Sequence, residues 1–447
     1  MRGPVLCLAL GLTACAAPLP PAMPSEPAWT QYSAERGWMV RALAAPGGAC
    51  PRLNWPGGSA TMAQRSAPGE VRAARFDAAS CEAAWPVGVA ALTVGNNGRS
   101  LTAPAAEPRH IVLVADTGCR MKLTDKAFQD CNDPVAWPFA RVARAAAAMK
   151  PDLIVHIGDI HYRESPCPAD QPGCAGSVWG YGEDAWRADF FTPAAPLLAA
   201  APWVFVRGNH EICKRAGVGW ARYLDAFALT PERRCDDPAR DDEGNFSPPY
   251  AVPLSADTQL IVFDSAAAVD KPYRSDDPVF QRYAQQLRQV QALALQRPHN
   301  IFLNHHPVLG FEAHADGHPR PGHAGLRSVM AAVEPQRLFA PTVDLVLNGH
   351  VHLFEALNFA SNHPATAVLG NSGSAMSGHL DAVEALAAEP APGTRLAQFD
   401  THRGYGFATL DRTSGGWTLT ARDTAGAALT VCSINGAAMQ RRSLASP

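Results

Sequence analysis

Five short segments of the chain contain side chains of the types that bind metal ions. In chain order they are Asp116-Thr117-Gly118, Gly158-Asp159-Ile160-His161-Tyr162, Gly208-Asn209-His210-Glu211, Asn304-His305-His306-Pro307 and Gly349-His350-Val351-His352. Carboxylate, phenolate, amide and imidazole groups suit cations such as iron, zinc and manganese. Two adjacent cations neutralise and orient a phosphate group and lower the pKa of a bridging water, which then attacks near neutral pH. The residue types therefore indicate a metal site, and a pair of ions held there would suit hydrolysis of a phosphoester.

Each segment follows a short apolar run that we expect to be a buried strand. The runs are Ile111 to Val114, Leu153 to Val155, Trp203 to Val206, Ile301 to Leu303 and Leu345 to Leu347. Between them, Trp137 to Met149 and Val279 to Gln296 are predicted helices, the latter beginning after Asp277-Pro278. Loops at the carboxyl ends of central strands in an α/β sheet converge on one crevice. The five segments are therefore expected to form a single site.

The order of the segments resembles the signature of the calcineurin-like metallophosphoesterases, from about residue 110 to 375. The commonest form of that family has Asp-x-His in its first motif, whereas Gly118 stands in the place of the histidine. Purple acid phosphatases also lack this histidine and use a tyrosine three residues after the second-motif aspartate. Tyr162 has that spacing from Asp159. The chain therefore resembles the purple acid phosphatases within the family.

The resemblance implies a site for two metal ions. One ion is expected to be held by Asp116, Asp159, Tyr162 and His352, and the other by Asp159, Asn209, His305 and His350. The phenolate and carboxylates of the first set suit Fe(III), and the imidazole and amide ligands of the second suit Zn(II), Mn(II) or Fe(II). His210 is expected to face the leaving group and to act as an acid or hydrogen-bond donor.

Other polar residues near the motifs have two interpretations. His161, Arg163 and Arg207 are candidates for contacts with the substrate. For His161 an orientation into solvent is an equal alternative, and for the two arginines a surface or structural salt bridge is. His306 directly follows a predicted ligand on an extended segment, so its side chain is expected to alternate away from the metal ions.

The predicted fold class is α/β. The resemblance implies an α-β-β-α sandwich over residues 106–447, made of two mixed sheets flanked by helices. Short alternating segments over residues 29–105 predict a smaller, N-terminal β-rich domain. Three further strands, Gly404 to Leu410, Trp417 to Asp423 and Leu429 to Ile434, are expected to complete the second sheet.

The N-terminus predicts export. Residues 1–15 contain Arg2, an apolar run from Val5 to Leu12, and a Leu-Thr-Ala-Cys sequence that resembles the bacterial lipobox, with Cys15 as the acylated residue. An ordinary cleaved signal peptide and a misplaced start are the alternatives. Residues 16–28 are predicted to be a tether, and the mature chain a periplasmic or cell-envelope lipoprotein of a bacterium that contacts the membrane through its lipid only.

The cysteines and the charge agree with this location. Eight of the cysteines after Cys15 fall into four pairs that are consecutive along the chain. An oxidising compartment would allow disulfides between Cys50 and Cys81, Cys119 and Cys131, Cys167 and Cys174, and Cys213 and Cys235. Cys432 would remain free. The net charge of -3 provides no field that would attract nucleic acid.

Three functions are compatible with these patterns. The complete ligand set and the export signal favour a phosphomonoesterase of broad specificity that acts on small phosphoesters outside the cytoplasm. A phosphodiesterase or nucleotide-cleaving enzyme is the alternative on the same centre. A non-catalytic surface lipoprotein would be expected to have lost a ligand or His210, and the sequence retains them all.

Overall fold

The computed structural model describes residues 26–95, 98–313 and 316–443. The first of its two large sheets has the order β28 (Ala438–Arg442), β27 (Ala428–Asn435), β26 (Gly416–Asp423), β25 (Gly406–Thr413), β11 (His110–Val114), β14 (Leu153–Ile157), β15 (Trp203–Val206), β1 (Ala28–Ser33), β2 (Gly37–Leu43), β8 (Ser80–Ala84) and β5 (Ala63–Ser66). The second has the order β16 (Tyr250–Pro253), β17 (Thr258–Val262), β18 (His299–Leu303), β21 (Val343–Asn348), β23 (Ala365–Leu369), β22 (Phe354–Phe359) and β24 (Leu396–His402).

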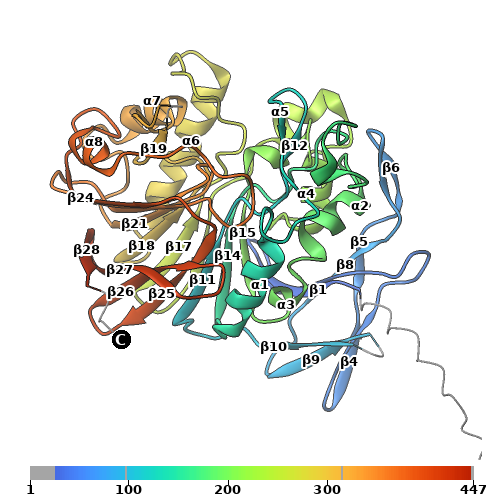
Figure 1. Ribbon diagram of the computed structural model, residues 1–447. Helices are drawn as coiled ribbons and strands as arrows, with labels where there is room; N and C mark the ends of the chain where they lie inside the picture. Colours follow the sequence, from blue (N-terminus) through green and yellow to red (C-terminus); the bar gives the residue numbers. More distant parts are fainter. Residues whose placement is uncertain (1–25, 96–97, 314–315, 444–447) are drawn as a thin grey trace, which may run out of the picture.

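The two sheets pack face to face because their central strands are apolar on both sides. Ile111 and Leu113 of β11 share one buried cluster with Ile301 and Leu303 of β18, whereas Val112 points to the opposite side of its sheet. That outer side is covered by α1 (Phe139–Ala148), α3 (Ala195–Leu198) and α4 (Gly217–Tyr223), and the outer side of the second sheet by α6 (Pro278–Ala294) and α7 (Ala324–Val333). The predicted α-β-β-α sandwich is confirmed (Figure 1).

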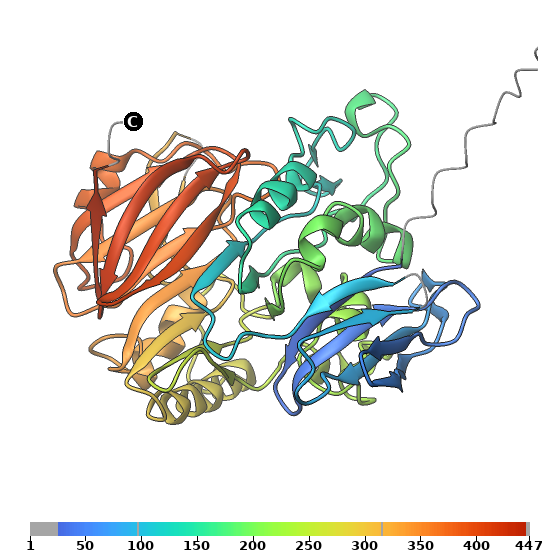
Figure 2. The ribbon, with the colours of Figure 1, turned by 90° about the horizontal axis from the view of Figure 1, so that it is seen from below.

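The N-terminal region is rich in strands, as expected, but its strands divide between two sheets. Strand β1 pairs in parallel with β15 at Gln31 and Trp203, and thereby adds β1, β2, β8 and β5 to the first large sheet. Strands β10 (Arg99–Thr102), β9 (Ala91–Val94), β3 (Arg52–Trp55) and β4 (Gly58–Thr61) form a separate small sheet. The predicted separate domain over residues 29–105 thus corresponds only to the small sheet, because the other strands belong to the first large sheet. Figure 2 shows residues 29–105 in shades of blue, far from the C-terminal strands.

The C-terminal strands form where the sequence predicts them, but the expected sheet was wrong. Strand β25 pairs antiparallel with β11, with Ile111 opposite Leu410, and β26, β27 and β28 follow outward from it. They therefore extend the first sheet rather than the second. Alternating apolar residues specify which face of a strand is buried and leave its neighbour undetermined, which explains the error.

All four expected disulfides are present, between Cys50 and Cys81, Cys119 and Cys131, Cys167 and Cys174, and Cys213 and Cys235. Cys432 is free and buried, also as expected. Cys15 and the predicted signal peptide lie outside the described residues. Among the residues that are described, no helix is both long enough and apolar enough to cross a membrane.

A buried acid in β22 generates a prediction about stability. Glu355 is fully buried; its Oε2 accepts the Phe311 N–H at 3.0 Å, and its Oε1 has no partner. Burial raises the pKa of Glu355 to about 8. In the unfolded chain the pKa of a glutamate is about 4.3. Between these pH values the native state therefore binds more protons than the unfolded state, so the free energy of unfolding falls as the pH rises.

We expect Glu355→Gln to remove this loss, because the amide stays neutral and Oε1 of Gln can still accept the Phe311 N–H. The melting temperature of the variant should exceed that of the wild type at pH 8, and the difference should shrink toward pH 5. Glu70→Gln, at an exposed position of β6 (Gly69–Val71), is the control. Identical pH profiles for the Glu355 variant and the wild type would contradict the assignment.

Candidate metal centre

The predicted ligands lie together at the carboxyl ends of the central strands. Tyr162 stands in the middle of one group: its Oη is 2.8 Å from Oδ1 of Asp116, 3.0 Å from Oδ2 of Asp159 and 2.9 Å from Nε2 of His352. All four side chains are buried. The structure thus brings together the residues expected to hold the first ion.

The residues expected to hold the second ion lie beside this group. Nε2 of His305 is 3.1 Å from Oδ2 of Asp159, and Nδ1 of His350 is 3.1 Å from Oδ1 of Asn209. Asp159 therefore faces both groups, as a bridging ligand must. The ligand atoms of Asp116, Asp159 and His305 lie within 4.8 Å of one another.

The backbone at three of these residues is strained. Asp116, Asp159 and His350 have φ angles of 54°, 54° and 72°, in the left-handed region that non-glycine residues rarely occupy. Such conformations cost about 1 to 3 kcal/mol each and persist only where the surroundings enforce them. Here the His350 N–H donates to Oδ2 of Asp116 at 2.8 Å, and the Asp116 N–H donates to the carbonyl of Gly158 at 3.0 Å.

The histidines are oriented as metal ligands. His305 directs Nδ1 to the carbonyl oxygen of Ile157 at 2.9 Å, and His352 directs Nδ1 to that of Ala375 at 2.6 Å. A hydrogen bond of this kind fixes the proton on Nδ1 and leaves the Nε2 lone pair for a metal. Nε2 of His305 is buried, and the acidic oxygen Oδ2 of Asp159 lies 3.1 Å from it. A ring nitrogen directed at the carboxylate of a residue with a strained backbone fits a bound cation between them.

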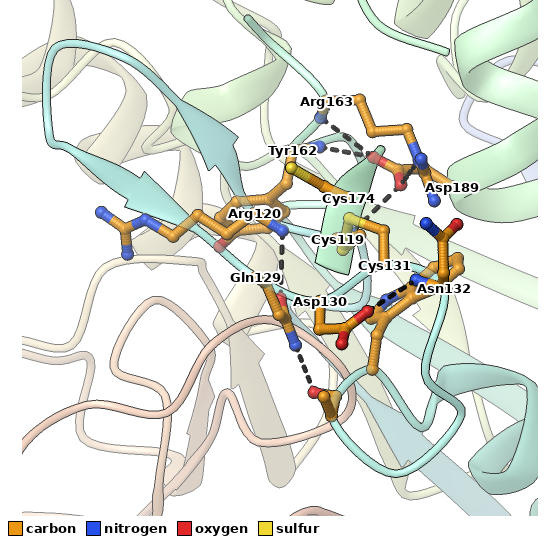
Figure 3. Close-up of a disulfide and its surroundings, with 12 residues drawn as sticks. Cys119, Arg120, Gln129, Asp130, Cys131, Asn132, Tyr162, Arg163, Cys174 and Asp189 are labelled. Atoms are coloured by element: carbon orange, nitrogen blue, oxygen red, sulfur yellow. Dashed lines mark hydrogen bonds and ion pairs between the residues drawn. A yellow bond between two sulfur atoms is a disulfide. The ribbon is translucent and has the colours of Figure 1, made fainter. Parts of the chain in front are cut away.

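Gly118 and Asp189 fix the loops around Tyr162. A Cβ at Gly118 would lie 2.6 Å from the carbonyl oxygen of Ile160 and 2.8 Å from Oδ2 of Asp189, so there is no room for a side chain. Figure 3 shows the buried carboxylate of Asp189 receiving the N–H groups of Cys119, Tyr162 and Arg163, at 3.1, 2.7 and 3.2 Å. Asp189 thus joins the loops after β11 and β14 and positions Tyr162.

Glu211 fixes the loop of Asp159 in the same way. Its fully buried carboxylate accepts the N–H groups of Asp159 at 3.1 Å, Ile160 at 2.8 Å, His161 at 3.0 Å and Gly208 at 3.1 Å. Glu211 belongs to one of the sequence motifs, but the motif alone does not reveal this role. Its position directly after His210 was the available signal.

Comparison with known proteins agrees with this geometry. The family model described as calcineurin-like phosphoesterase matches residues 109–354, which is more than half of the chain. The chain belongs to the calcineurin-like phosphoesterase family. No curated protein sequence matches the phosphoesterase significantly.

Solved structures share its fold at low sequence identity. The purple acid phosphatase PPD1 from seeds of yellow lupin (Lupinus luteus) is 15% identical with a TM-score of 0.54, and the match covers 90% of this phosphoesterase and 73% of the lupin chain. A structure of PhoD is 12% identical with a TM-score of 0.55, covering 96% of this chain and 94% of the other.

His210 lies at the edge of the candidate centre and has a carboxylate partner. Its Nδ1 is 2.7 Å from Oε1 of Glu164, and its Nε2 is 3.7 Å from Oδ2 of Asp159. Arg215 pairs with Glu164 and donates to the carbonyl oxygen of Asn209 at 3.0 Å. The sequence motifs did not reveal Glu164, which lies 46 residues before His210, or Arg215, which lies five residues after it and whose Nη2 is 2.6 Å from Nδ1 of His210.

The three residues considered for substrate contacts lie inside the protein. Arg163 donates from Nε to Asp189 at 2.6 Å, and Arg207 donates to the carbonyl oxygens of Glu211 at 2.8 Å and Gly244 at 2.7 Å. The ring of His161 is fully buried, 5.6 Å from the ring of Trp186. The two arginines thus have the structural contacts expected as their alternative, whereas His161 does not point into solvent.

We expect Glu164→Gln to lower kcat of the phosphoesterase about 10- to 100-fold, a part of the 100- to 10,000-fold that a positioned proton donor contributes. The carboxylate orients His210 and stabilises its protonated form, and an amide does so less well. Burial would raise the pKa of Glu164, but His210 and Arg215 outweigh it and hold that pKa well below its usual range. The charge is thus present at every working pH.

Steady-state kinetics and metal analysis of the purified variant test this prediction. Metal content should stay at the wild-type level, since Glu164 lies outside the ligand groups. Glu232→Gln, at an exposed position paired with Arg240, is the matched control. Wild-type kcat in the Glu164 variant would show that the contact with His210 has no part in turnover.

Proposed function

We propose that this phosphoesterase hydrolyses phosphate monoesters with a centre of two metal ions. The observation that best supports the proposal is the place of Tyr162, whose hydroxyl lies within 3.0 Å of Asp116, Asp159 and His352 while Gly118 leaves no room for another ligand. Asp116, Asp159, Tyr162 and His352 hold one ion, and Asp159, Asn209, His305 and His350 hold the other.

The ligand types guide the choice of ions. A phenolate and two carboxylates favour a hard trivalent ion, so the first site takes Fe(III). The second site combines two imidazoles, an amide oxygen and a carboxylate, and takes Zn(II), Mn(II) or Fe(II). When bound, such a pair supplies positive charge to the phosphate group and lowers the pKa of a water molecule.

The residues of the chain provide the remaining steps. His210 stands beside Asp159 and donates a proton or hydrogen bond to the leaving oxygen. Glu164 keeps the ring of His210 oriented through Nδ1, which directs Nε2 toward the centre. The buried Glu211 and Asp189 hold the loops of the ligands, so that little reorganisation is needed during turnover.

Export as a lipoprotein is part of the proposal. The four disulfides support an oxidising compartment. Acylation at Cys15 would then tether the enzyme to the cell envelope. We expect Cys15→Ser, expressed in a bacterium with lipoprotein processing, to move the protein from the membrane fraction to the soluble fraction and to abolish labelling by palmitate. Retention in the membrane fraction with palmitate still incorporated would contradict acylation at this residue.

The reaction is tested by comparing an aryl phosphate monoester with the corresponding diester across pH. We expect monoester turnover to dominate and to fall at least about 100-fold in Asp159→Asn, because even outer partners of metal ligands contribute about 10- to 100-fold. Metal analysis should show iron with one divalent ion in the wild type and a loss in the variant. Asp276→Asn, at an exposed position, is the control.

Two other outcomes of the ester comparison would contradict the proposal. Dominant turnover of the diester would replace the proposal with a phosphodiesterase on the same centre. Absence of turnover of either ester by protein containing both ions would contradict a broad phosphatase and favour a binding protein.

A further inference from the structure

Three imidazole rings form a compact triangle at the edge of the centre. The ring centroids of His305 and His306 are 5.0 Å apart, those of His305 and His350 are 5.1 Å apart, and those of His306 and His350 are 4.4 Å apart. One ligand atom from each ring lies within 4.8 Å of the others. His306 is buried, although the alternation of an extended segment predicted that it would point away.

The alternation fails because the strand ends before this pair. Strand β18 ends at Leu303, and the chain bends at His305 and His306. Side chains alternate across an extended strand but not through a bend. Neighbouring histidines can therefore direct their rings toward the same space.

The spacing of the rings fits a single ion. Imidazole ligands bound at about 2.1 Å, with angles of about 90° to 110° between them, have ring centres roughly 4.5 to 5.3 Å apart. The observed separations of 4.4 to 5.1 Å are close to this interval. Three rings packed for apolar contact alone would have no reason to bring their nitrogen atoms together.

The outer nitrogen of His306 is held as in the predicted ligands. Nδ1 of His306 is 3.1 Å from Oγ of Ser265, and that hydroxyl also accepts the His306 N–H at 3.2 Å. The corresponding Nδ1 of His305 is held by the carbonyl oxygen of Ile157. The Ser265 hydroxyl can accept a hydrogen bond from Nδ1–H, and in that tautomer it orients the ring and leaves Nε2 for the metal.

We infer that His306 is a third imidazole ligand of the second, divalent ion, together with His305 and His350. The inference rests on the proposed two-ion centre and adds a residue to it. Three imidazoles with an amide and a carboxylate make the second site rich in nitrogen, which suits zinc.

His323 provides a matched comparison. Its ring centroid lies 4.6 Å from that of His306, on the side of α7, so it belongs to the same stack of rings. Its Nδ1 accepts the Leu326 N–H at 3.2 Å and caps α7. His323 is not among the residues whose ligand atoms converge. His323→Asn keeps an acceptor for the cap and removes the ring.

X-ray absorption at the zinc edge tests the inference on the full-length wild type containing iron and zinc. The signal reports the zinc environment alone, and we expect three imidazoles. Zinc affinity, measured by competition with a chelator, should fall at least about 10-fold in His306→Ala and His306→Gln, in line with the effect of losing a ligand partner. The iron content of both His306 variants should equal that of the wild type. The zinc affinity of His323→Asn should also equal that of the wild type.

Two imidazoles at the zinc edge of active protein, with unchanged zinc affinity in both variants, would overturn the assignment of His306 and leave the proposed reaction intact. Failure of the wild type to bind zinc, manganese or iron(II) beside the first ion would overturn the two-ion centre and this inference with it. The zinc-edge measurement is made on the wild type. It therefore tests ligation by His306 even if a His306 variant fails to fold.

Discussion

The fixed position of the Asp159 carboxylate is the constraint on which the site depends. Its Oδ1 accepts the His210 N–H at 2.8 Å, and its Oδ2 faces Tyr162 and His305. A Cβ at Gly208 would come within 2.1 Å of both Oδ1 and the amide nitrogen of Asp159, so the loop after β15 must approach as bare backbone. The two loops are therefore built as one unit.

Buried acids that bind no metal in this scheme maintain that unit. Glu211 collects the N–H groups of the Asp159 loop, and Asp189 collects those around Tyr162. Each carboxylate satisfies several buried donors at once, which offsets the cost of burying its charge. The left-handed conformation of Asp159 persists because these contacts leave it no alternative.

Much of this arrangement follows from local patterns. The five strand ends and their ligands could be predicted from the sequence, because apolar runs predict buried parallel strands and such strands end at one edge of the sheet. The disulfides pair between neighbours in the chain. The roles of Glu164 and Asp189 and the pairing of β25 with β11 depend on contacts between distant segments, which no single-sequence pattern encodes. The closeness of the His306 ring to those of His305 and His350 was not predicted, because a strand rule was extended by two residues into a bend.

The candidate ligands come from both sheets. Asp116, Asp159 and Asn209 follow strands of the first sheet, and His305 and His350 follow strands of the second. The disulfides of the described residues all lie within residues 50–235, so none of them joins the two sheets.

Bound ions would thus cross-link the two sheets of the sandwich. Their binding free energy would add to the free energy of unfolding. A free ion concentration one hundred times the dissociation constant adds about 2.7 kcal/mol. The metal supply of the compartment would then govern how long the protein survives there, in addition to how fast it works.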